Sequence, residues 1–104
     1  MDVKFQWIGW CNEDNHDKVW GYFTLDTISN PWGNNTYYTF WGRRGKTPQI
    51  KKDVYRHSQI AKLRDSKLKK GYVKVNEAKL TEIFPDFNDF LEQQFVLKTL
   101  KGEV

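Results

Sequence analysis

Cysteine is nearly absent from this chain, because Cys11 is the only one among 104 residues. No internal disulfide can therefore stabilise the fold, and a lone thiol is typical of a reducing, cytoplasmic setting. The chain also lacks an apolar run of the roughly 20 residues that a membrane span requires. Its first residues, Met1–Lys4, show no basic segment followed by an apolar one. We therefore expect no signal peptide and no membrane contact.

Groups suited to metal binding or covalent catalysis are also scarce. The two histidines, His16 and His57, have no Cys, His or carboxylate partners at metal-ligand spacing. Asp53 and His57 share a helix face at i, i+4, but no nucleophile motif accompanies them. The sequence thus predicts no metal, no cofactor and no catalytic residue, and hence a protein that is not an enzyme.

Positive charge, by contrast, is concentrated in one block. Residues 43–74 carry twelve Lys and Arg against two acids, a net charge of +10, whereas residues 1–42 and 75–104 each have a net charge of −3. The block begins directly behind the aromatic run Tyr37–Trp41. Cations can hold phosphates and neighbouring rings can stack on bases or sugars, so this pairing favours nucleic acid.

Alternating and aromatic-rich segments predict an antiparallel sheet in the first half of the chain. Strands are predicted over residues 4–11, 18–25, 37–41 and 49–52, with a further extended stretch at 72–75. A helix is predicted from about Asp53 to Lys70, with Asp53 as its N-cap and Gly71 as its C-terminal stop.

An acidic, aromatic segment follows, in which helical spacing is broken once by Pro85. It either covers the sheet or docks on a protein partner, and the candidate docking residues are Phe87, Phe90, Leu91 and Phe95. The predicted fold is α+β: a small antiparallel sheet of about four strands, one main helix, and a C-terminal helical segment. We predict one domain at 1–75, with residues 76–104 as its extension.

The run Tyr37–Gly45 (YYTFWGRRG) resembles the signature of the WGR domain, in which an aromatic strand leads into Trp-Gly-Arg, one residue and Gly. That family continues with a strand, a basic helix and a Gly-aromatic close, an order that residues 49–72 match. The resemblance covers roughly residues 4–75. It implies DNA binding near strand ends, with Trp41 on the sugar of a terminal nucleotide and Arg43 on the nearby backbone. WGR domains occur in poly(ADP-ribose) polymerases and some bacterial proteins, and a stand-alone version suits a bacterium or a phage.

The function predicted from the sequence is nucleic-acid binding, DNA more than RNA, through phosphate backbone and strand ends. The candidate contact residues are Trp41, Gly42, Arg43, Arg44, Lys46, Lys51, Lys52, Arg56, Lys62, Lys69 and Lys70. The alternative is a protein-interaction module, for example a phage-encoded binder of a host factor, that docks through the basic block or the aromatic segment. A small nuclease is a third, weaker interpretation.

Overall fold

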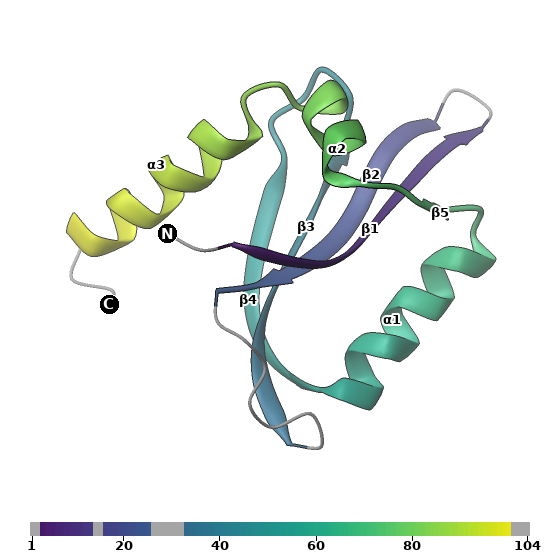
Figure 1. Ribbon diagram of the computed structural model, residues 1–104, viewed down its shortest axis with the longest axis horizontal. Helices are drawn as coiled ribbons and strands as arrows, with labels where there is room; N and C mark the ends of the chain where they lie inside the picture. The colour runs from purple at the N-terminus through teal and green to yellow at the C-terminus, as the bar shows by residue number, and fades with distance from the viewer. Residues whose placement is uncertain (1–2, 14–15, 26–32, 101–104) are drawn as a thin grey trace.

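The computed structural model describes residues 3–13, 16–25 and 33–100, and it shows an α+β fold (Figure 1). The strands are β1 (Lys4–Glu13), β2 (His16–Thr24), β3 (Asn34–Arg43), β4 (Gln49–Arg56) and β5 (Val73–Lys74). The helices are α1 (His57–Lys69), α2 (Glu77–Ile83) and α3 (Phe87–Leu100). The strands form one antiparallel sheet in the order β4-β3-β2-β1-β5. The predicted fold class is confirmed, with five strands in the described part.

The predicted boundary between β4 and α1 is wrong by four residues. Asp53 is not a helix cap, because β4 continues to Arg56 and pairs with β3 as far as Asn34. The Asp53 carboxylate instead accepts a hydrogen bond from the backbone of Val54. Gln59 takes the capping role, since its side-chain oxygen accepts from the Arg56 backbone at 2.8 Å.

A β-bulge in β1 sets which side chains share a face of the sheet. The register with β2 shifts between Phe5 and Trp7, and an extra residue moves the following side chains to the opposite face. Simple alternation predicts Phe5 on the same side as Trp7, which is wrong. Phe5 packs edge-on against Phe23 and Phe40, on the other face.

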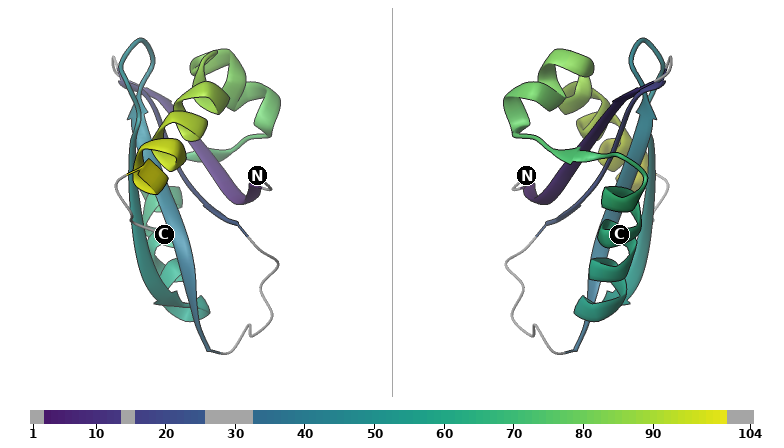
Figure 2. Two further views of the ribbon diagram at one scale, coloured as in Figure 1. Left: turned by 90° about the vertical axis from the view of Figure 1, so that its left-hand side faces the viewer. Right: turned by 90° about the vertical axis from the view of Figure 1, so that its right-hand side faces the viewer.

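Each face of the sheet carries its own hydrophobic core. On one face, β-strand residues such as Val19, Phe23 and Phe40 pack against buried residues of the two C-terminal helices. On the other, Trp7, Trp20 and Tyr37 pack against residues that include Ile60 of α1. Figure 2 shows α2 and α3 gathered over one end of the twisted sheet, with α1 apart from them. No described helix is long and apolar enough to cross a membrane.

The partner role predicted for the C-terminal aromatic residues needs correction. Phe87 is 3% exposed and Leu91 is 2% exposed, because both pack into the core under α2 and α3. Phe90 is half-buried, and the Phe95 side chain lies outside the described part. Phe87 and Leu91 therefore stabilise this fold, and they are not a surface for another protein.

Candidate functional site

A groove of about 460 Å³ lies between the C-terminal end of α1 and the neighbouring ends of β2 and β3. Its lining is aromatic and cationic, with one aliphatic residue and one glycine. The residues are Lys18, Val19, Trp20, Trp41, Gly42, Arg43, Lys67 and Tyr72. Among the cavities of the described residues, this one is lined by the Trp-Gly-Arg motif together with further aromatic and cationic side chains.

Strand register places the sheet side of the groove. Trp20 of β2 lies directly opposite Trp41 of β3, and Lys18 lies opposite Arg43. Because side chains alternate between faces, these four residues share the face that α1 covers. Trp20 is buried, Trp41 is half-buried, and the Arg43 side chain is exposed at the strand end.

The end of α1 supplies the other wall. Gly71 has a φ of +98°, a left-handed conformation that ends the helix and turns the chain back over the sheet. The Tyr72 backbone N–H then donates to the Lys67 carbonyl at 3.1 Å. Lys67 Nζ lies 5.5 Å from the ring centroid of Trp20 and 5.7 Å from that of Tyr72. Lys18 Nζ lies 5.8 Å from the Tyr72 centroid, so two amines face the same ring.

The electrostatics of the groove favour an anionic ligand. Burial, together with the charges of Lys70 and Lys18, lowers the pKa of Lys67 below that of a solvated lysine. Within the described residues, no carboxylate forms an ion pair with Lys18, Arg43 or Lys67. An anion bound there would relieve the repulsion among these cations.

Three predicted site residues, Trp41, Gly42 and Arg43, meet in this groove. The absence of a side chain at Gly42 is explained by packing within the fold and not by room for a ligand. A Cβ at Gly42 would lie 3.1 Å from Pro48 Cα and 3.3 Å from Phe84 Cζ on the opposite face. A side chain at position 42 would crowd Pro48, which follows the β3–β4 turn, and Phe84, which follows α2.

Arg44 belongs to a different cluster on the α2 side of the sheet. Its Nε donates to Asp17 Oδ2, and the two side chains form an ion pair. Asp17 also accepts a hydrogen bond from Trp10 Nε1 at 2.7 Å, and Lys79 Nζ lies 4.2 Å from the Trp10 ring centroid. The hydrogen bond from Trp10 and the charge of Arg44 lower the pKa of the Asp17 carboxyl. Much of the Arg44 charge is therefore compensated within the fold.

The remaining predicted cations spread around the molecule. Lys51 and Lys52 are adjacent on the edge strand β4, so they point to opposite faces, and Lys51 pairs with Asp53 at 3.4 Å. Arg56 precedes α1. Lys62, Lys69 and Lys70 are exposed on or just beyond α1. Of these, Lys70 is close enough to Lys67 to affect its pKa.

Five groove residues were not predicted from the sequence: Lys18, Val19, Trp20, Lys67 and Tyr72. The antiparallel register brings Lys18 and Trp20 to Arg43 and Trp41. Lys67 follows the buried Ile60 by seven residues, which places both on the same side of α1. This seven-residue spacing in the sequence could have predicted that Lys67 faces the sheet.

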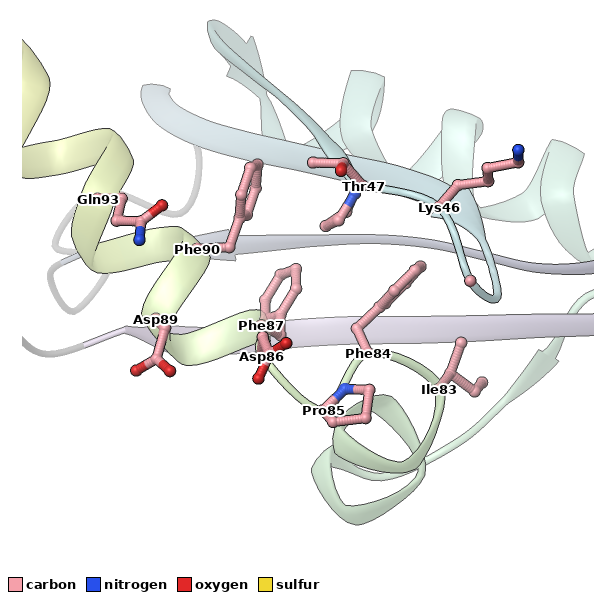
Figure 3. Close-up of a pocket in the computed structure, with 12 residues that line it drawn as sticks. Lys46, Thr47, Ile83, Phe84, Pro85, Asp86, Phe87, Asp89, Phe90 and Gln93 are labelled. Carbon is pink, nitrogen blue, oxygen red and sulfur yellow. The ribbon is translucent and has the colours of Figure 1, made fainter.

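A second cavity, of about 560 Å³, lies between the β3–β4 turn and the α2–α3 connection. Figure 3 shows Phe84, Phe87 and Phe90 along it, while the Lys46 amine extends away from these rings. Asp86 and Asp89 also line it. Lys46 is thus separate from the groove that holds Trp41 and Arg43.

Within the described residues no group of His, Cys, Asp or Glu is arranged to hold a metal ion. Comparison of the chain with protein-family models, curated proteins and solved structures finds no match. The resemblance to the WGR domain therefore stays a prediction that rests on the residues of the motif.

Proposed function

We propose that this protein binds nucleic acid, DNA in preference to RNA, and that the groove between α1 and the β2–β3 ends holds an exposed or terminal nucleotide. The observation that carries the proposal is the juxtaposition of Trp41 and Arg43 with Lys18 and Lys67. Aromatic faces accept a base or a sugar, and the cations accept the flanking phosphates. Contacts of this kind hold the backbone and do not read base sequence.

The surrounding charge supports the same function. Lys69 and Lys70 extend the positive field from the groove along the end of α1, and Arg43 presents a planar guanidinium at the end of β3. Such a field speeds association with a polyanion and makes affinity depend on salt. Binding through phosphate contacts does not require α1 to enter a groove of the DNA duplex.

The order of elements supports the resemblance to the WGR domain. β3 leads through Trp41-Gly42-Arg43 into a turn, and β4, α1 and Gly71-Tyr72 follow in sequence. The resemblance implies that Trp41 contacts the sugar of a terminal nucleotide and that Arg43 contacts the nearby backbone. Both residues line this groove. Helices α2 and α3 lie outside the motif and contribute to the core.

The test is a set of titrations with fluorescent blunt duplex, nicked duplex, single-stranded DNA and RNA at several salt concentrations. We expect tighter binding to DNA with ends or single strands than to closed circular duplex. Each cation that contacts a duplex phosphate should add about 0.9 to the slope of log K against log salt. Absence of binding at low salt would contradict the proposal and favour a protein partner.

A further inference from the structure

Lys67 differs from the exposed lysines of α1 in its chemical surroundings. Its side chain is half-buried and its Nζ lies over the rings of Trp20 and Tyr72. Lys18 approaches from β2, Arg43 stands at the end of β3, and Lys70 follows on the same chain segment. Each of these neighbours is a cation, so the local environment opposes protonation of the amine.

Glu13, the acidic residue of β1, lies near the end of α1 but does not neutralise Lys67. The Glu13 carboxylate lies beside Gly71, 3.1 Å from where a Cβ would stand. Within the described residues, Glu13 forms no ion pair with Lys67. Burial and the neighbouring cations lower the pKa of Lys67. A larger fraction of its amine is then neutral and nucleophilic near neutral pH.

We propose that Lys67 forms an imine with the C1′ aldehyde of an abasic deoxyribose held in the groove. The Nζ lone pair attacks the aldehyde carbon, and the carbonyl oxygen becomes the hydroxyl of a carbinolamine after a proton passes to it from nitrogen. Loss of water then leaves a C=N bond. One amine and one aldehyde give one imine and one water, with no oxidant, reductant or metal. This inference rests on the proposed binding of DNA.

The groove suits this reaction in shape and in chemistry. Its volume of about 460 Å³ is within the range of small-ligand sites, about 300–1,000 Å³. An abasic sugar has no base, so the ring-opened sugar can lie against the half-buried Trp41 with its aldehyde toward Lys67. Arg43 and Lys18 are placed for the flanking phosphates. Intact nucleotides carry no aldehyde, so the chemistry selects the damaged site.

The experiment is reductive trapping on a duplex that contains one abasic site. Cyanoborohydride converts an imine to a stable secondary amine, and peptide mapping of the adduct should identify Lys67. Lys67→Arg keeps the positive charge but removes the nucleophile, so the trapped yield should fall about tenfold or more. The matched variant Lys4→Arg, at an exposed position at the start of β1 and outside the groove, should retain the wild-type yield.

A duplex with a tetrahydrofuran abasic analogue, which has no aldehyde, separates the two proposals. If neither wild type nor Lys67→Arg binds this duplex, the proposed DNA binding fails as well. If both bind it and no adduct maps to Lys67 of the wild type, the imine proposal is wrong and DNA binding stands. Free deoxyribose 5-phosphate is the second control. Equal trapping by this small aldehyde at equal concentration would overturn the assignment of the site to abasic DNA.

Discussion

The Nζ atom of Lys67 lies 5.5 Å from the ring centroid of Trp20, so a cation of α1 covers an aromatic residue in the sheet. A leucine would be the ordinary choice seven residues after the buried Ile60. The lysine stem covers the ring instead, and the cation–π contact contributes about 0.5–2 kcal/mol, which offsets part of the cost of desolvation. This position keeps the groove polar and leaves a positive charge beside Trp41 and Arg43.

Phe87→Ala should destabilise the fold by about 3–5 kcal/mol, the range for a buried Phe reduced to Ala. Phe87 is 3% exposed and its ring contacts Phe5, Phe40 and Phe84. Urea unfolding followed by circular dichroism measures the change. Phe90→Ala is the matched variant, and it should cost less because Phe90 is half-buried. Equal losses for the two variants would contradict the packing of α3 described above.

Tyr37→Phe should raise the free energy of unfolding by about 1 kcal/mol, because an unpaired buried hydroxyl costs about 1–3 kcal/mol. The Tyr37 side chain is 1% exposed, and its hydroxyl has no hydrogen-bond partner within the described residues. Burial and the neighbouring Tyr22 raise the pKa of this phenol. Tyr22→Phe is the control, since the Tyr22 hydroxyl faces the Arg64 charge and its removal should bring no gain. A lower melting temperature for Tyr37→Phe would reveal a partner for this hydroxyl.

The sequence predicted the α+β class and the succession of strands along the chain, because alternation and composition act locally. It also named Trp41 and Arg43, which the structure places in one groove, as candidate contact residues. It did not predict which side of the sheet Phe5 occupies, since one bulge in β1 reverses the alternation. It also missed Lys18 and Lys67, because their positions depend on strand register and on the packing of α1. Tertiary pairing sets these features, and no local pattern carries them.

Stability in acid should depend on Asp17. The pKa of this carboxyl is lowered in the folded protein, so its contribution is present above 3.8, the ordinary value, and is lost as pH falls through the folded-state pKa. Asp17→Asn should therefore cost up to about 1 kcal/mol at neutral pH, because the carboxylate is partly exposed. The difference from wild type should vanish well below pH 3.8.

Thermal melts of both proteins across this pH range make the comparison. The Asn side chain can still accept the hydrogen bond from Trp10, so the substitution isolates the charge that pairs with Arg44. Asp53, whose pKa is also lowered, titrates in both proteins and cancels. A constant difference at every pH would show that the Asp17 charge contributes nothing.

Arg43 and Arg44 are adjacent but should differ in their effect on DNA binding. Arg43 lines the groove, whereas Arg44 is paired with Asp17 on the other face. Arg43→Ala should weaken binding to every DNA form and lower the salt slope by about one. Arg44→Ala should lower the slope less. Fluorescence titrations at several salt concentrations provide both slopes, and equal changes would mean that only total charge matters.

Trp41→Ala separates recognition of DNA ends from simple attraction of charge. Trp41 is half-buried beside Arg43 at the end of β3, where it lines the groove. If this ring stacks on an exposed nucleotide, Trp41→Ala should weaken binding to single strands and blunt ends by about 1–3 kcal/mol. Binding to closed circular duplex, which has no end to stack, should be unchanged.

The ring also packs against the core beneath α1, so the fold of each variant is checked by circular dichroism. Trp41→Phe keeps an aromatic face and should retain part of the preference for ends. Trp20→Phe is not a substitute control, because Trp20 is buried and carries the contact with Lys67. Suppose folded Trp41→Ala binds ended and circular DNA as tightly as wild type does. End recognition by this groove is then wrong, and the cations around it act only as a non-specific electrostatic surface.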